Sequence, residues 1–181
     1  MTEKPFTLIV LVLLALAITF YLHTESTPQH VPTGAPVDDF GPAPDLSLPI
    51  GLNGKHVDLS SLKGNVVLLD FWATWCGPCK MSIPEVESIY SKYKDKKLKV
   101  VGISIDDVET RREVDSSVKV LGMTYPVAMA VDIPDIRDKY TFASIPLLII
   151  IDKKGIVRAR ITGYDPSSHP EDIVKKLLDE K

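Results

Sequence analysis

The chain holds two cysteines, and only two residues separate them in the segment Cys76-Gly77-Pro78-Cys79. The segment follows an apolar run, residues 66–72, and precedes sequence of helical character. A buried strand that ends in such a turn places the first sulfur at a helix N-terminus, where the dipole and free backbone N–H groups favour a thiolate. A thiolate attacks disulfides, and the second cysteine can then close a ring and expel the trapped partner. The spacing predicts redox-active thiol chemistry.

Two other uses of a cysteine pair compete with this interpretation: a structural disulfide and half of a zinc site. A pair supplies only half of the ligands that structural zinc takes, and no histidine lies nearby in the sequence. Two cysteines also provide no disulfide framework of the kind that small secreted domains use. A redox-active pair is the leading interpretation.

Asp70 lies inside the apolar run that precedes the cysteines. An acid in such a strand is unfavourable unless it is neutral or hydrogen-bonded, and burial raises its pKa. A raised pKa brings a carboxyl group into the range that is useful for proton transfer. The alternative is a solvated aspartate at the end of a strand.

Strand-like and helix-like segments alternate along the rest of the chain. We expect strands at residues 45–49, 55–59, 66–72, 98–105, 125–131, 145–151 and 156–162, and helices at residues 79–94, 108–121, 134–140 and 171–178. This order implies an α/β fold with a mixed central sheet that helices cover on both faces.

Residues 1–22 are predicted to be an N-terminal membrane anchor. The apolar run at residues 6–22 reaches about 25 Å as a helix, and its uncharged flanks bring it close to a ~30 Å hydrocarbon core. A cleaved signal peptide is the alternative, because residues 15–17 resemble a cleavage site, yet hydrophobic sequence continues beyond them. Residues 23–44 are rich in proline, so we expect a semi-stiff linker before a domain at residues 45–181.

The distribution of charge predicts where the domain lies. Lys4 precedes the apolar run, whereas no Lys or Arg occurs between His23 and Gly54. The positive-inside rule then places the N-terminus in the cytoplasm and the domain outside the cell membrane, in the periplasm or on the outer face. A formal net charge of -3 and a pI near 5.8 argue against nucleic acid as a partner.

Residues 70–80, Asp-Phe-Trp-Ala-Thr-Trp-Cys-Gly-Pro-Cys-Lys, closely resemble the active-site segment of thioredoxins. Residues 139–146, which end in Ser-Ile-Pro, are similar to the thioredoxin segment with the cis-proline. The opening at residues 43–49, Ala-Pro-Asp-Leu-Ser-Leu-Pro, and the extra helix and strand at residues 108–131 resemble the TlpA/ResA branch. The resemblance implies a thioredoxin-like fold with an N-terminal strand extension and a helix–strand insert.

The TlpA/ResA family consists of membrane-tethered thiol–disulfide oxidoreductases that act outside the cytoplasm, and many members reduce apocytochrome c before haem attachment. The resemblance therefore implies a protein-disulfide reductase whose partners are client proteins with disulfides or thiols. It also implies a membrane thiol protein as the electron donor. We expect a monomeric domain.

The roles of the reacting residues follow from the same resemblance. Cys76 corresponds to the exposed attacking thiolate, Cys79 to the buried resolving thiol, and Asp70 to the acid that relays a proton to that thiol. Many TlpA-like sequences carry asparagine in place of Asp70, so the chain resembles thioredoxin itself at this point. We expect no cofactor other than the redox-active Cys76–Cys79 pair, and no metal.

The substrate-binding positions also carry over. Trp75 matches the residue that flanks the attacking sulfur, and Gly77-Pro78 is the dipeptide associated with reducing members. The Ile145–Pro146 bond is expected to be cis, which leaves the backbone of Ile145 free to pair with an extended substrate.

Three other functions compete with disulfide reduction. A disulfide-forming oxidase or isomerase uses the same motif. Peroxide reduction is suggested by the Ala-Pro-Asp opening, which peroxiredoxins share. In peroxiredoxins, however, a threonine stands three residues before the attacking cysteine, whereas Thr74 stands two residues before Cys76. Copper carriers of related fold use the motif Cys-x-x-x-Cys and a distal histidine. The cysteine spacing here is one residue shorter, and His169 is the only histidine late enough in the sequence to serve as that ligand.

Overall fold

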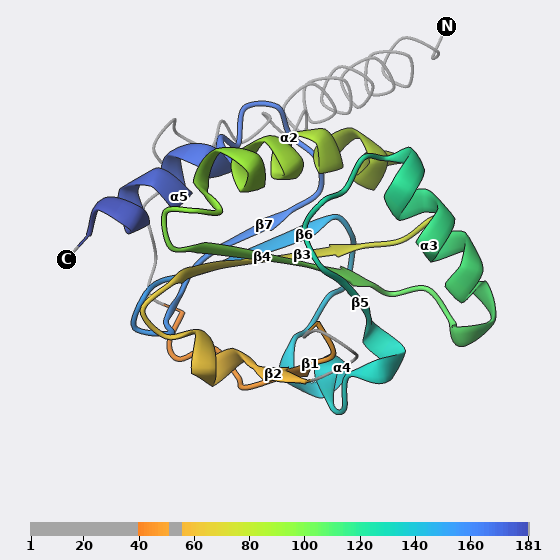
Figure 1. Cartoon of the computed structure of the whole chain (residues 1–181), viewed down its shortest axis with the longest axis horizontal. Helices are drawn as coiled ribbons and strands as arrows, with labels where there is room; N and C mark the ends of the chain where they lie inside the picture. Colours follow the sequence, from red (N-terminus) through yellow and green to blue (C-terminus); the bar gives the residue numbers. More distant parts are fainter. Residues whose placement is uncertain (1–39, 51–55, 181) are drawn as a thin grey trace, which may run out of the picture. The chain divides into compact units, whose positions relative to one another are not determined.

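The computed structural model describes residues 40–50 and 56–180. Its centre is a five-stranded sheet in the order β5-β4-β3-β6-β7 (Figure 1). β4 runs parallel to β3 and β5, whereas β6 is antiparallel to β3 and β7, so the predicted mixed sheet is confirmed. The strands are β3 (Val66–Trp72), β4 (Leu98–Ser104), β5 (Val127–Met129), β6 (Leu147–Ile151) and β7 (Val157–Thr162).

β3 is the central strand because its side chains, apart from Asp70, are apolar and pack on both faces of the sheet. All seven of its residues are buried, and Leu68 lies opposite Val100 of β4 and Ile150 of β6. Alternate side chains of a strand point to opposite faces, so a strand that is buried on both faces has a continuous hydrophobic sequence. The strand ends at Trp72, directly before the turn that carries the cysteines.

Helices cover one face of the sheet, as Figure 1 shows. They are α2 (Gly77–Tyr93), α3 (Arg111–Val120) and α5 (Pro170–Asp179). The core on this face joins Leu68 of β3 to Ile83 of α2, Val114 of α3 and Val174 of α5. α2 continues through Pro84 without a break in the helix.

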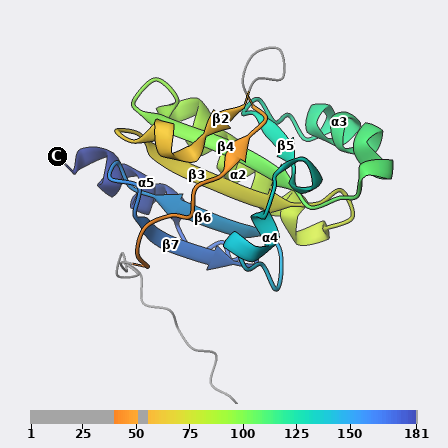
Figure 2. The ribbon, with the colours of Figure 1, turned by 90° about the horizontal axis from the view of Figure 1, so that it is seen from below.

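The opposite face is covered by α4 (Ile136–Lys139) and by a separate two-stranded sheet of β1 (Ser47–Leu48) and β2 (Val57–Asp58) (Figure 2). Leu48, Leu69 and Ile136 share the core on this side. The predicted strand extension and the helices on both faces are therefore confirmed. The two extension strands pair with each other and not with the main sheet.

Residues 40–44, which the sequence assigns to the linker, are hydrogen-bonded to the domain. The backbone N–H of Phe40 donates to the carbonyl of Val157 at 3.0 Å, and that of Ala43 donates to Gly155 at 2.9 Å. We call residues 40–44 the N-terminal strap. Because these bonds continue the β7 edge, the domain begins before residue 45.

The insert between β4 and β6 differs in detail from the prediction. The predicted helix at residues 108–121 is a short 3₁₀ turn, Val108–Thr110, followed by α3, and the predicted strand at residues 125–131 contracts to β5. Pro126 has no N–H for a strand ladder, although its carbonyl accepts a hydrogen bond from Gly102 at 2.9 Å. Tyr125 turns into the core.

The predicted membrane anchor, residues 1–22, lies outside the described residues, as does most of the predicted linker. Within residues 40–50 and 56–180, no helix is both long and apolar enough to cross a membrane.

Candidate active site

The two cysteines form a disulfide at the N-terminus of α2, with their Cα atoms 5.3 Å apart. Cys76 is the N-cap of the helix, and its Sγ accepts a hydrogen bond from the backbone N–H of Cys79 at 3.1 Å. Gly77 and Pro78 fill the first positions of the helix, where proline costs nothing because the N–H has no intrahelical partner. The free N–H groups of this first turn stabilise negative charge on the sulfur of Cys76.

The two cysteines differ slightly in their access to solvent. Cys79 is fully buried, as predicted, whereas Cys76 is 5% exposed. The prediction of an exposed Cys76 is therefore wrong for this disulfide form, in which the sulfur lies against the helix start and the chain around Ile145. The neighbouring Trp75 is 68% exposed, which contradicts ordinary core packing for its side chain.

A buried carboxylate holds the turn that carries Cys76. Asp106, 2% exposed, follows β4 and accepts hydrogen bonds from the N–H of Thr74 at 2.9 Å and from its hydroxyl at 2.6 Å. The hydroxyl of Ser104 donates to the same carboxylate at 2.7 Å. This cluster fixes the segment between β3 and α2 two residues before the reacting sulfur. The sequence pattern did not predict this cluster, although Ser-Ile-Asp at the end of a buried strand is a usable signal for it.

The Ile145–Pro146 peptide bond is cis, as expected. The carbonyl oxygen of Ile145 lies 3.9 Å from Sγ of Cys76, although 69 residues separate the two in the sequence. β6 begins directly after Pro146 and pairs with β3, so the sheet brings this bond to the same edge as the turn with the cysteines. The structure thus brings together the predicted nucleophile and the predicted substrate-binding backbone.

Asp70 is completely buried, so the alternative of a solvated aspartate is wrong. It lies on β3 between Leu68 and Trp72, which both face the core that contains Cys79. Desolvation raises its pKa to about 6, against the effect of a hydrogen bond that the hydroxyl of Tyr125 donates to Oδ2 at 2.9 Å. Asp70 therefore faces α2, the helix that begins at the disulfide, and titrates near neutral pH.

Two buried side-chain polar atoms of β3 have no hydrogen-bond partner among residues 40–50 and 56–180. They are Oδ1 of Asp70 and Nε1 of Trp72. Their side chains project from the same face of β3, because residues i and i+2 of a strand share a face. One oxygen of Asp70 is thus held by Tyr125, and the other is available for a proton.

The described residues contain no group of three or more His, Cys, Asp or Glu side chains that could hold a metal ion. His169, considered above as a copper ligand, is the N-cap residue of α5.

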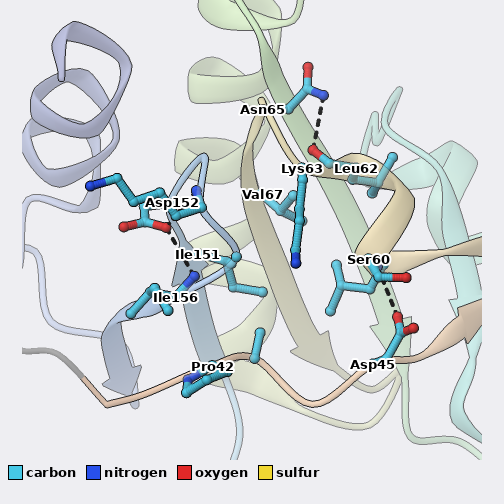
Figure 3. Close-up of a pocket in the computed structure, with 14 residues that line it drawn as sticks. Pro42, Asp45, Ser60, Leu62, Lys63, Asn65, Val67, Ile151, Asp152 and Ile156 are labelled. Atoms are coloured by element: carbon cyan, nitrogen blue, oxygen red, sulfur yellow. Dashed lines mark hydrogen bonds between the residues drawn. The ribbon is translucent and has the colours of Figure 1, made fainter. Parts of the chain in front are cut away.

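A cavity of about 270 Å³ lies away from the cysteines, where β3 begins and β6 ends (Figure 3). Val67, Ile151 and the side chain of Lys63 line it. Asp152 stands at its edge and accepts a hydrogen bond from the N–H of Ile156 at 2.9 Å. None of the predicted site residues lines this cavity.

Comparison with known proteins identifies the relatives of this domain. Residues 41–160 match the AhpC/TSA family. The thiol-disulfide oxidoreductase ResA of Bacillus thuringiensis (strain Al Hakam) is 35% identical over 126 residues, which are 70% of this chain and 71% of ResA. The thioredoxin-like protein YneN of Bacillus subtilis (strain 168) is 36% identical over 117 residues, 64% of this chain and 66% of YneN.

Solved structures give the same result. A thiol:disulfide interchange protein of the thioredoxin family from Chlorobium tepidum TLS superposes with a TM-score of 0.65 and 30% identity, over 76% of this chain and 95% of that structure. StoA from Bacillus subtilis superposes with a TM-score of 0.59 over 73% of this chain and 98% of its own, and at 22% identity it supports the fold.

The matched region contains the disulfide, the buried Asp70 and nearly all of the sheet that positions them. The predicted redox-active pair thus lies within the region shared with relatives that are named thiol-disulfide oxidoreductases. The chain belongs to the AhpC/TSA family of thioredoxin-like proteins and is a thiol–disulfide oxidoreductase related to ResA.

Proposed function

We propose that this oxidoreductase works as a reductase of client disulfides outside the cytoplasm, with apocytochrome c as the first client to test. The observation that carries the direction is the buried Asp70 on the face of the sheet that packs against α2. Its pKa is about 6, so it is mostly negative at neutral pH. A negative charge near the cysteines opposes a thiolate and so favours the disulfide form of the enzyme. An enzyme whose disulfide form is favoured gives its electrons away.

The reaction proceeds in two exchanges. The Cys76 thiolate attacks one sulfur of the client disulfide, a mixed disulfide forms, and the other client sulfur leaves as a thiolate. Asp70 takes the proton of the Cys79 thiol as Cys79 attacks Sγ of Cys76. The Cys76–client bond breaks, and the second client sulfur leaves with its electron pair. The client gains two electrons, and the enzyme is left with the Cys76–Cys79 disulfide.

The reduction potential of the Cys76–Cys79 couple tests the direction. A potential near the ~-270 mV of thioredoxin, or lower, is expected for a reductase. A potential that approaches ~-120 mV would assign the protein to disulfide formation instead. Equilibration of the chain with defined dithiol–disulfide buffers measures the value directly.

A trapping variant tests the client chemistry. Cys79→Ser cannot resolve the mixed disulfide, so it is expected to accumulate covalent adducts with client proteins in cells. Cys76→Ser lacks the attacking sulfur and serves as the control without adducts. Mass spectrometry of the adducts then asks whether apocytochrome c is among them; failure of Cys79→Ser to form any adduct would end the reductase proposal.

The proposed location rests on residues 1–22, with a single membrane pass, a cytoplasmic N-terminus and the domain outside. In this arrangement a membrane thiol protein reduces the disulfide after each turnover, and the domain acts as a monomer. Protease added to intact spheroplasts is expected to digest the domain, while a cytoplasmic marker protein survives. Protection of the domain until the membrane is lysed would show the opposite topology.

Peroxide reduction is the second candidate, because the AhpC/TSA family model matches the chain. The position of Thr74 disfavours it. The hydroxyl of Thr74 donates to Asp106 at 2.6 Å, and the residue stands two positions before Cys76. Rapid consumption of hydrogen peroxide by the reduced protein would favour peroxide reduction over disulfide reduction.

A further inference from the structure

A tyrosine from the insert reaches the buried acid of the redox site. Tyr125 is 2% exposed and lies between α3 and β5. Its hydroxyl donates a hydrogen bond to Oδ2 of Asp70, a residue 55 positions away in the sequence. β4 leaves room for its ring: Gly102 is the register partner of Asp70, and a Cβ at that position would lie 3.1 Å from the ring. A side chain on Gly102 would therefore require Tyr125 and Val127 to shift by a few tenths of an ångström.

The loop that carries Tyr125 is hydrogen-bonded to and packed against α2, the helix that begins at the disulfide. Glu87 of α2 accepts hydrogen bonds from the N–H of Thr124 at 2.7 Å and from its hydroxyl at 2.6 Å. The ring of Tyr90, also on α2, packs edge-on against Tyr125 with centroids 5.9 Å apart. The position of the tyrosine hydroxyl is thus set by the same helix that carries Cys79.

The surroundings of Asp70 contain few other polar groups. Its register partners on β4 and β6 are Gly102 and Leu148, which carry no charge. α2 contributes Cys79 to the core on this face and Glu87 as the charge that acts on Tyr125. Burial and Asp70 both raise the pKa of Tyr125, so the phenol stays protonated and remains a donor.

We propose that Tyr125 is a positioning residue for the deprotonation of Cys79. Its hydroxyl holds Oδ2 of Asp70, keeps the carboxylate ionised at neutral pH and leaves Oδ1 to take the proton. The Cys79 proton passes to Oδ1 as the Cys79–Cys76 bond forms, and the electron pair of the breaking Cys76–client bond leaves with the client thiolate. The proposal rests on the role of Asp70 as base in the proposed function.

Tyr125→Phe removes the hydrogen bond that stabilises the carboxylate, and so raises the pKa of Asp70 above its value of about 6. Because a base must be ionised to accept a proton, the pH midpoint of the Cys79 step is expected to rise by about one unit. The step slows roughly fivefold at pH 6 and recovers at pH values well above the new midpoint. Attack by Cys76 keeps its own pH profile.

The reaction of the reduced full-length protein with 5,5′-dithiobis(2-nitrobenzoate) separates the two steps. The first coloured thiolate is released when Cys76 attacks, and the second when Cys79 resolves the mixed disulfide. Stopped-flow traces between about pH 5 and 9 give both midpoints. Tyr90→Phe is the matched control, since it removes a hydroxyl from the ring next to Tyr125 and leaves the hydrogen bond to Asp70 intact.

A raised midpoint of the second phase in Tyr125→Phe, absent in Tyr90→Phe, supports the proposal. An unchanged midpoint in a Tyr125→Phe protein that still forms its disulfide overturns it. In an Asp70→Asn background, Tyr125→Phe is expected to have no further effect on the second phase, because the tyrosine acts through the carboxylate. If Asp70→Asn does not slow the second phase, Asp70 is not the base, and the proposal for Tyr125 is overturned as well. An oxidising potential, by contrast, overturns only the direction of the proposed function.

Discussion

Two buried aspartates of this domain have opposite roles, and the difference lies in their hydrogen bonds. Asp106 accepts bonds from an N–H and two hydroxyls, so burial leaves its carboxylate well satisfied. Asp70 accepts a single bond from Tyr125, and its second oxygen has no partner within the described residues. A buried carboxylate with a single hydrogen-bond partner favours its protonated form, as the raised pKa of Asp70 shows. Asp70 is thus suited to proton transfer and Asp106 to holding a loop.

The raised pKa of Asp70 makes its ionisation oppose folding. Its folded value is about 6 against 3.8 for the free group, so its favourable contribution is complete below about pH 4 and is lost as the pH rises through 6. Asp70→Asn removes this dependence. We expect the variant to be more stable than the parent at pH 8, by on the order of 3 kcal/mol, and to gain little at pH 3.5.

Urea unfolding of both proteins at the two pH values measures the difference. Asp95→Asn, at an exposed position in the turn after α2, is the matched carboxylate control and should show no such gain. Equal stability of Asp70→Asn and the parent at pH 8 would show that Asp70 is not destabilised by burial.

Trp75 combines a large apolar ring with an exposure of 68% beside the reacting sulfur. An aromatic side chain in that position can bury its area against a protein client but gains little from a small disulfide. Trp75→Ala is expected to slow exchange with a protein disulfide several-fold, to leave exchange with a small aromatic disulfide nearly unchanged, and to alter stability by less than about 0.5 kcal/mol.

Parallel rate measurements on the two substrates test this role, with Val120→Ala as the control because Val120 is 85% exposed on α3. An equal loss on both substrates would assign Trp75 to the reactivity of Cys76, and no loss on either would remove it from the client surface.

At the scale of elements, the turn between β3 and α2 depends on the end of β4. Asp106→Ala leaves the N–H and hydroxyl of Thr74 and the hydroxyl of Ser104 without their shared acceptor. At about 1 kcal/mol for each lost bond, the variant should lose about 3 kcal/mol of stability. Attack by Cys76 should slow as well, because the loosened turn no longer holds the sulfur against the helix start.

Asp107→Ala is the matched control, since Asp107 is the next residue and is exposed. Chemical unfolding measures the loss of stability. The first phase of the reaction with 5,5′-dithiobis(2-nitrobenzoate) measures attack by Cys76. The role of Asp106 in holding the turn would be refuted if both variants unfolded at the same denaturant concentration.

The elements that the sequence predicted well are those with a strong local signal. β3 and α2 carry an apolar run and an apolar stripe, and their order around Cys76 fixes the centre of the site. The predicted strand at residues 125–131 is longer than β5, because Tyr125 and Val131 continue a β-like composition. The strand itself pairs only from Val127 to Met129. Composition over a few residues cannot show where a partner strand ends.

The site divides in the same way. Cys76 and Cys79 follow from spacing alone, and the resemblance added Pro146 and the role of Asp70. Tyr125 could not be predicted, because its partner lies 55 residues away and no local pattern selects the tyrosine that will reach it. Contacts of this kind depend on how the insert packs against α2, which is a property of the tertiary structure.

At the scale of the whole domain, the sheet separates the redox site from the N-terminal strap. Cys76 follows the end of β3, and Pro146 precedes the start of β6, so both lie at one end of these antiparallel strands. The strap bonds to Gly155 and Val157, where β6 ends and β7 begins, at the other end. Under the proposed anchoring, the chain enters the domain at the end remote from the disulfide, which leaves that end open to clients.

This separation predicts that the strap supports the fold without supporting the chemistry. A chain that begins at Asp45 loses the bonds of Phe40, Gly41 and Ala43 to the β7 edge and the bond from the Tyr140 hydroxyl to the carbonyl of Pro44. Compared with a chain that begins at Asp38, it should be less stable by about 2–4 kcal/mol. Its exchange rates should be equal while both are folded, because the strap bonds to the end of β6 and the start of β7, which is the end of the sheet remote from the turn with Cys76. Urea midpoints and the two chromogenic phases measure both quantities, and a slower second phase in the shorter chain would mean that the strap is coupled to Asp70 through β3.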